Sequence, residues 1–218
     1  MSVTYTTTYR DERGEIATLI ENDGKSLRMR LGAVEFVGRD LDSLEVVGSP
    51  DTAELSRFSF ASGCLCSCSL EFEIPATVLT GPGEVPGSLR VRLALGKPKP
   101  TGGLDAERVQ ITLVVRDRRV ESRGLSGWFE DELVDIQRGL PNGWHLKICF
   151  GCASSNYSPV GHGLFGDLAC FRDNKSGYLT VKSKTEYWPV LKTMTEAVQE
   201  TYLCPEFEVR KPGTGYRG

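Results

Sequence analysis

Hydrophobic and polar residues alternate over several short stretches in the first 120 residues, which is the period of a β-strand with one buried face. The clearest alternations lie at residues 27–31, 89–95 and 109–113. Clusters of Gly and Pro separate these stretches, as is typical of turns. The pattern predicts an antiparallel β-sandwich lobe over residues 1–120, with about seven or eight strands.

The pattern after residue 120 mixes helical and strand periods. Helices are predicted from the cap residue Ser126 to about Arg138 and from the cap residue Ser183 to about Tyr202, and strands at residues 144–150 and 178–182. Pro189 falls near the first turn of the second helix, where proline is tolerated. We therefore expect residues 121–218 to form a small α/β lobe with two helices, so that the fold class is α+β and mainly β.

Four of the seven cysteines, all in the C-terminal third, give the most specific chemical signal in the chain. Cys149-Phe-Gly-Cys152 has the spacing of a zinc knuckle, in which the chain turns back and both sulfurs face one ion. Cys170 follows on the far side of a Gly- and Ser-rich loop from Ala153 to Asp167, and Cys204 lies just past the second predicted helix. Four thiolates make the closed tetrahedral shell of a structural zinc ion. We therefore expect these four cysteines to bind structural Zn and to order that loop.

Two other interpretations of these cysteines stay open. They are buried free thiols, or Cys149 and Cys152 form a redox pair. The redox interpretation is weaker because no βαβ pattern surrounds the motif, which follows a strand without opening a helix.

The other three cysteines, Cys64, Cys66 and Cys68, stand at alternate positions of one predicted strand. They share parity with Leu70 and Phe72, which continue the hydrophobic face of that strand. We therefore interpret them as core cysteines, with a metal or redox role as the alternative.

His162 is the one weak candidate for a catalytic residue. It lies in the Gly-rich stretch Gly161–Gly166. Three roles stay open for it: a general base, a replacement metal ligand and a solvated histidine without a specific function. The stretch matches GxGxxG, but because no strand leads into it and no helix follows, we interpret the glycines as loop geometry. His145 is expected on the solvated or interlobe face of a strand, and the adjacent acids Glu130 and Asp131 are expected on the solvated face of a helix. The chain has no nucleophile elbow, P-loop, zincin helix or kinase motif, so no enzyme class is assigned.

Composition and charge restrict the classes of partner. With 39% hydrophobic and 25% charged residues the chain resembles an ordinary globular protein, and its net charge of −3 comes without a basic block. Nucleic acid is therefore not an expected partner. The polar N-terminus lacks the features of a signal peptide, and no apolar run reaches the roughly 18 residues of a membrane span. We expect a cytoplasmic protein that does not bind membranes.

Several blocks of the C-terminal half form a recognisable signature. They are Cys149–Cys152, Asn156–Pro159, Gly161–Gly166, Cys170-Phe-Arg172, Gln199–Phe207 and Gly213–Gly218. Through these blocks the chain, over about residues 126–218, resembles an uncharacterised bacterial family of unknown function. The resemblance implies an intact C-terminal lobe and no particular activity. Polar and aromatic residues near the proposed ligands suggest a binding surface at this end; they are Arg172, Glu200, Glu206, Arg210, Tyr216 and Arg217.

These observations favour a zinc-stabilised binding or accessory protein, with a protein or peptide as its partner. A toxin to be neutralised, a precursor peptide and a biosynthetic enzyme all suit this role. The alternative is a metal- or thiol-dependent enzyme that acts on a peptide or small molecule near the loop from Ala153 to Asp167. A shell of four cysteines leaves no open coordination position for substrate, which favours the structural role. The oligomeric state stays open.

Overall fold

The computed structural model describes residues 2–159, 161 and 163–216. The protein is mainly β, and its paired strands are antiparallel, as the sequence predicts. Most strands belong to one large sheet: β1 (Val3–Asp11), β2 (Gly14–Asn22), β3 (Leu27–Leu31), β4 (Val34–Gly38), β5 (Glu45–Val47), β6 (Ser59–Ala61), β7 (Cys64–Cys66), β8 (Cys68–Thr80), β9 (Gly83–Leu95), β10 (Glu107–Val115), β11 (Arg118–Glu121) and β12 (His145–Leu146).

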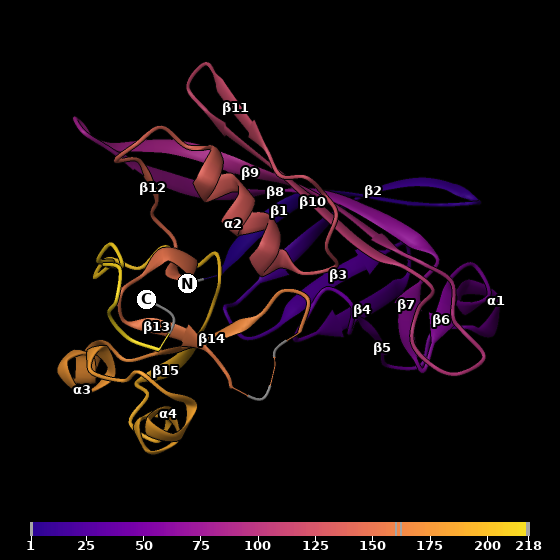
Figure 1. The fold of residues 1–218 in the computed structure, drawn as a ribbon. Coiled ribbons are helices and arrows are strands. Elements are labelled where there is room, and N and C mark those ends of the chain that lie inside the picture. Colours follow the sequence, from indigo (N-terminus) through magenta and orange to yellow (C-terminus); the bar gives the residue numbers. More distant parts are fainter. Residues whose placement is uncertain (1, 160, 162, 217–218) are drawn as a thin grey trace.

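A second sheet of three strands lies in the C-terminal part of the chain. Its members are β13 (Ser155–Tyr157), β14 (Asp167–Cys170) and β15 (Glu196–Gln199). The helices are α1 (Thr52–Leu55), α2 (Phe129–Gly139), α3 (Lys175–Leu179) and α4 (Lys184–Leu191), with short 3₁₀ turns η1 (Cys149–Gly151) and η2 (Arg172–Asn174). Figure 1 shows α2 lying along the large sheet and α3 and α4 gathered around the small one.

The large sheet follows a single hydrogen-bonded path rather than dividing into two sheets. The strand order is β11-β10-β9-β8-β1-β2-β3-β4-β5-β7-β6, and β12 pairs with β8 beside this path. The sandwich predicted from the sequence is therefore one continuous antiparallel sheet. Sequence alternation identified strands of this sheet but not their pairing, because pairing partners such as β1 and β8 lie far apart in the chain.

A break at Ser67 explains how this sheet rolls over its own core. Ser67 has a φ of 53°, so the extended chain is interrupted between β7 and β8. β7 pairs with β5 and β6, whereas β8 pairs with β1 and β9. Since one residue joins these two regions of the sheet, they must lie close together. Phe58 accordingly packs edge-on against both Tyr9 of β1 and Phe36 of β4.

The main hydrophobic core extends past the predicted lobe boundary at residue 120. The alternation at residues 27–31 and 89–95 is confirmed, because their hydrophobic side chains are buried and the residues between them are exposed. The same core contains Phe129, Leu133 and Ile136 of α2, together with Leu164 and Phe165. The core is thus shared across the boundary, and the division into two lobes stays a prediction.

Helix α2 forms where the sequence predicts a helix, but it begins at Phe129. Ser126 does not cap it. The Ser126 hydroxyl donates to the carboxylate of Glu132 instead, and the backbone N–H groups of Gly124 and Ser126 donate to the same carboxylate. The loop before the helix is therefore fixed by a side chain from within the helix.

The predicted strand at residues 178–182 is wrong. Residues 175–179 form the helix α3, whose first turn is capped by the Asn174 side chain accepting from the Gly177 N–H. Tyr178 points into a buried aromatic cluster, stacked on Phe171 and edge-on to Tyr187. Packing of this one ring and the Asn cap favour the helix over the weak local strand signal.

The second predicted helix is much shorter than expected. The Ser183 cap is confirmed, but α4 ends at Leu191 instead of Tyr202. Pro189 lies inside the helix, beyond its first turn, where it removes a helical hydrogen bond. The chain then turns and enters β15, in which Val198 is buried as a strand residue.

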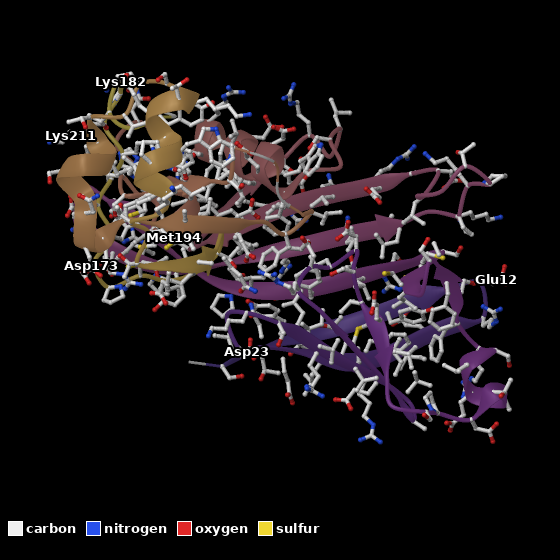
Figure 2. The ribbon with its side chains drawn as sticks, turned by 90° about the horizontal axis from the view of Figure 1, so that it is seen from below. Glu12, Asp23, Asp173, Lys182, Met194 and Lys211 are labelled. Carbon is white, nitrogen blue, oxygen red and sulfur yellow. The ribbon has the colours of Figure 1, made fainter. Side chains whose placement is uncertain are left out.

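Two further segments differ in extent from the prediction. The strand expected at residues 144–150 is reduced to His145 and Leu146, after which the chain enters η1. The expected loop from Ala153 to Asp167 contains the buried strand β13. Figure 2 shows Lys182, Met194 and Lys211 at the end of the molecule opposite Glu12, which lies at the tip of the β1–β2 hairpin.

Candidate functional site: the four-cysteine cluster

Cys149 and Cys152 stand at the two ends of the tight turn η1. The Cys152 N–H donates to the Cys149 carbonyl at 3.1 Å, so the chain reverses between the two thiols. The packing at Gly151 is close: a Cβ at this position would lie 3.2 Å from the Leu146 carbonyl oxygen and 3.8 Å from the ring of Phe207. The turn matches the reversal expected of a zinc knuckle.

The C-terminal segment wraps both sides of this turn. On one side the N–H groups of Cys149 and Phe150 donate to the carbonyls of Tyr202 and Glu200 at 3.0 and 2.9 Å. On the other side the Ala153 N–H donates to the Glu208 carbonyl at 2.8 Å. Cys204 lies in the stretch between these two attachments, which holds it beside the turn.

The four cysteines predicted as ligands are brought into one buried region. Cys149, Cys170 and Cys204 belong to one hydrophobic cluster with Tyr157, Leu168 and Val198. Cys152 is also buried, and its sulfur lies 3.5 Å from the Ser154 hydroxyl. None of the four is more than 4% exposed, and all are free thiols. Segments that are distant in sequence therefore meet at these four side chains.

The thiols interact electrostatically. Burial raises the pKa of Cys149, and the neighbouring thiols of Cys152, Cys204 and Cys170 raise it further. These are the effects expected when sulfurs crowd together in an apolar setting, and the nearby charge of Arg172 opposes them only in part. In this environment the thiol form of Cys149 is favoured over the thiolate.

Arg172 is a cation whose side chain contacts the thiols of this cluster. Its side chain hydrogen-bonds Cys170 and interacts electrostatically with Cys204, and it forms an ion pair with Glu196. The Arg172 Nε is buried and has no hydrogen-bond partner among the described residues. A buried guanidinium N–H without an acceptor beside thiols is a donor placed for a thiolate.

The donor set fits zinc, but the arrangement falls short of coordination geometry. Four thiols are the ligands of a structural zinc site. Within the described ranges, however, no three His, Cys, Asp or Glu side chains are grouped so as to hold a metal ion. The zinc site thus stays a prediction.

The Gly-rich stretch that contains His162 is positioned by Asp40. His162 itself lies outside the described residues. The Asp40 carboxylate accepts from the Phe165 N–H, and a Cβ on Gly163 would overlap that carboxylate. The glycine at 163 allows this close approach, and the interpretation of the stretch as loop geometry stays a prediction.

Three residues expected on a free binding surface are used internally. Glu200 is fully buried and accepts from the Tyr157 hydroxyl and the Gly166 N–H. Arg210 donates to the carbonyls of Cys152 and Ser155, and Tyr216 stacks on Tyr187. Glu200 is therefore not part of a surface, whereas Arg210 and Tyr216 stay partly exposed, because the chain that carries them wraps back onto η1 and α4. The binding surface at this end stays a prediction. Glu206 is exposed, and Arg217 lies outside the described residues.

The interpretation of Cys64, Cys66 and Cys68 as core residues is correct only in part. Cys68 belongs to the main core, but Cys64 is half-exposed, with its thiol directed at Glu45. Cys66 is buried but does not belong to the main hydrophobic core. Its neighbour Leu65 is the residue of β7 that packs into that core. The break at Ser67 shifts the alternation by one residue, so the three cysteines do not share one face.

Sequence reasoning missed a buried polar contact that ties the small sheet to the large one. The Asn22 amide donates to the Tyr5 hydroxyl at 2.7 Å and to the Gln199 side-chain oxygen at 2.6 Å. An Asn beside an Asp-Gly turn is the usual signature of a turn residue, so no local signal marks it as a buried partner of Gln199.

None of the described helices is long and apolar enough to cross a membrane.

Comparison with known proteins gives a family but no function. The sequence model of a family of unknown function (DUF6304) matches residues 3–155. The match takes in the large sheet, α2 and the turn with Cys149 and Cys152, and it ends before Cys170. The family match and the resemblance seen in the C-terminal half overlap only over residues 126–155. The signature blocks from Asn156 onward therefore lie outside the family match. No curated protein and no solved structure matches the chain.

Proposed function

The chain belongs to DUF6304, a family of unknown function, and we propose that it is a zinc-stabilised binding protein in which Cys149, Cys152, Cys170 and Cys204 hold a structural zinc ion. The observation that carries this proposal is the meeting of four buried free thiols from separate segments at one turn. Zinc would draw the four sulfurs together as thiolates and neutralise the repulsion among them.

The surroundings of the thiols support a structural role for the metal. A catalytic zinc ion keeps one position open to water or substrate, whereas four sulfurs close the shell. All four thiols are buried, and the unpartnered Arg172 Nε would donate to a metal-bound thiolate as an outer-shell hydrogen bond. The metal would thereby fasten the wrapped C-terminal segment to η1.

Exposed apolar side chains near the fastened segment support a binding role. Tyr202 and Leu203, directly before Cys204, are 39% and 43% exposed. Trp188 and Met194, in and after α4, are also exposed. Exposed apolar side chains that lie together in one patch are typical of surfaces that contact a partner. The proposed partner is a cytoplasmic protein or peptide, such as a toxin or a biosynthetic enzyme.

The alternative enzyme is less well supported. A nucleophilic cysteine requires a lowered pKa and access to substrate. Cys149 has neither, since burial raises its pKa.

The experiment is a measurement of zinc content on the purified full chain by elemental mass spectrometry. About one zinc ion per chain is expected, as for other four-cysteine sites. Cys204→Ser should lose the metal and melt at a lower temperature. Cys64→Ser, which changes a half-exposed cysteine outside the cluster, should keep both properties. A metal-free wild type, or full zinc content in Cys204→Ser, contradicts the proposal.

A further inference from the structure

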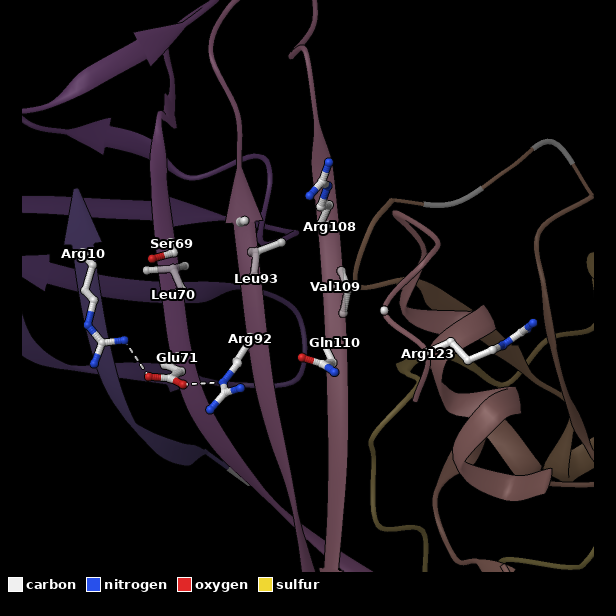
Figure 3. A pocket seen from close by; sticks show the side chains of 12 residues that line it. Arg10, Ser69, Leu70, Glu71, Arg92, Leu93, Arg108, Val109, Gln110 and Arg123 are labelled. Carbon is white, nitrogen blue, oxygen red and sulfur yellow. Dashed lines mark hydrogen bonds and ion pairs between the residues drawn. The ribbon is translucent and has the colours of Figure 1, made fainter. Parts of the chain in front are cut away.

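The outer face of the large sheet carries a hollow lined by arginines. Its volume is about 640 Å³, and its charged lining residues are Arg10, Glu71, Arg92, Arg108 and Arg123. Figure 3 shows these side chains on β1, β8, β9, β10 and the segment that follows β11, with Arg123 directed away from the other arginines. The opposite face of these strands is buried against the main core.

Sheet register explains why a hollow forms here. Arg10 pairs with Ser69, Ser69 with Ala94, and Ala94 with Arg108. Two small residues thus lie side by side across the middle of the sheet, with an arginine on each flank. Since neighbouring strands are about 4.8 Å apart, the two arginine backbones are separated by roughly 14 Å. The small side chains form the floor of the hollow.

The arginines differ in how far they are neutralised. Glu71 bridges Arg10 and Arg92, at 2.7 and 2.6 Å. Arg123 pairs with Asp135 at 2.8 Å. The described residues supply no hydrogen-bond or ion-pair partner for the side chain of Arg108. One guanidinium in the hollow is therefore free to bind an anion.

A second hollow continues the first along the strands. It has a volume of about 320 Å³, shares Glu71 and Arg92 with the first, and adds Glu73, Arg90 and Arg119. Arg90 and Arg92 are alternate residues of β9, so they project from the same face about 6.7 Å apart. The two hollows together form a strip that follows the strand direction.

The lining of this strip contains more arginines than carboxylates. Six arginines and two glutamates line the two hollows, in a protein whose net charge is −3. Every cation in the lining is an arginine, whose planar guanidinium binds a carboxylate through two parallel hydrogen bonds. Five of the six arginines are ion-paired with Glu15, Glu71, Glu73, Glu121 or Asp135 in exposed pairs, which contribute little each. Among the described residues, Arg108 is the arginine of the strip that is free to bind a carboxylate.

We propose that this strip binds an acidic polypeptide segment in an extended conformation, with Asp or Glu at alternate positions. Alternate side chains of an extended chain are about 6.7 Å apart, which matches the spacing of Arg90 and Arg92 on β9. Nucleic acid fits less well, because single strands also require exposed rings on which bases stack. Phe72, the aromatic residue in the lining, is buried in the core.

The proposal names a partner class for the binding role proposed above and rests on that role. No residue of the strip belongs to the four-cysteine cluster, so peptide binding and zinc binding are tested separately.

The test is fluorescence anisotropy of the full chain with a fluorescein-labelled, end-blocked peptide of sequence Asp-Thr-Asp-Thr-Asp-Thr-Asp. At low salt the peptide should bind, and replacement of every Asp by Asn should abolish binding. Arg108→Gln should weaken binding about fivefold, the size expected for one charge-assisted contact. Arg57→Gln, which removes an exposed arginine outside both hollows, should change it less than about twofold.

Thermal melting checks that Arg108→Gln is folded. Should this variant melt at a lower temperature, Gln110→Glu replaces it in the same assay. This nearly isosteric change puts a negative charge in the first hollow and is also expected to weaken binding. The proposal is overturned by equal binding of the Asn peptide, by unchanged affinity in a folded variant, or by a dT oligonucleotide that binds more tightly than the Asp peptide.

Discussion

Asp40 shows how the tertiary structure alters the chemistry of a single carboxyl group. The side chain is partly buried where the loop after β4 meets the Gly-rich stretch, and it accepts from the N–H groups of Leu41 and Phe165. Burial raises its pKa to about 6, and the nearby carboxylates of Asp42 and Asp167 add to the effect. The two backbone hydrogen bonds oppose this shift without cancelling it.

The raised pKa of Asp40 predicts a pH-dependent stability. Its ordinary value is 3.8, so the folded protein binds the proton more tightly than the unfolded chain does. The stability contributed by this proton is complete below about pH 4 and is lost as the pH rises through about 6. Asp40→Asn keeps an acceptor for Phe165 and should raise the free energy of unfolding at pH 8 by about 1–3 kcal/mol, with less effect at pH 4.

Urea unfolding at pH 4 and pH 8 measures this difference. Asp131→Asn, an exposed change on α2, is the control and should alter stability little at either pH. An Asp40→Asn effect of the same size at both pH values contradicts the prediction.

Ser67 is a residue whose role the sequence does not reveal. A serine between two cysteines looks like the polar position of a regular strand, and on that basis Cys64, Cys66 and Cys68 were expected on one face. Its positive φ depends on the two different sets of partners of β7 and β8, which only the folded sheet defines. The sequence therefore predicted the buried face of β8 but not the shift before it.

The conformation of Ser67 gives a prediction for β-branched substitutions. Ser67→Val should lower the free energy of unfolding by about 1–3 kcal/mol, because a β-branched residue is strained at positive φ. Ser67→Gly, which adopts this conformation without strain, should be close to wild type. Chemical denaturation measures the free energy of unfolding of the two variants. Equal values would show that the backbone at position 67 imposes no strain on a β-branched residue.

At the scale of an element, α2 shows which part of a helix its sequence determines. The spacing of Phe129, Leu133 and Ile136 correctly predicts the helix and its buried face. It does not predict the start of the helix or the burial of Glu132, because the groups that satisfy this carboxylate belong to the preceding loop. A charged residue in a helical pattern is usually solvated, and only the path of the loop makes Glu132 an exception.

Glu132 should therefore be a strong determinant of stability. Glu132→Ala leaves the part-buried N–H groups of Gly124 and Ser126 without their acceptor and should cost about 2–4 kcal/mol. Asp131→Ala, the exposed neighbour on the same helix, should cost less than about 0.5 kcal/mol. Guanidinium unfolding gives both values, and similar losses for the two variants would contradict the assigned role.

At the scale of the whole molecule, the C-terminal segment is the region that the sequence describes least well. The cysteine spacing correctly suggested that distant segments meet. The backbone hydrogen bonds that wrap residues 200–210 around η1 have no local signature, since each joins groups about 50 residues apart. This wrap also turns residues such as Glu200 and Arg210 inward.

Metal removal should loosen this wrap selectively. If zinc fastens the segment, chelation should speed amide hydrogen exchange at Cys149, Phe150 and Ala153, whose N–H groups bond to the C-terminal segment. Amides in the paired centre of β8 and β9 should keep their protection. Exchange rates at these three amides that do not change on chelation would contradict a metal role at η1. That result would not bear on the proposed peptide binding by the arginine strip.

The position of β1 has a consequence for how the chain is made. β1 is paired on one side by β2, which follows it at once, and on the other by β8, which begins at Cys68. On the ribosome, strands β1 to β5 emerge while that second edge still lacks its partner. A free edge of this kind is a site for mispairing with other nascent chains until synthesis has passed β8. Shortened versions of the protein that end before β8 should therefore accumulate as aggregates, whatever the fate of the C-terminal cysteines.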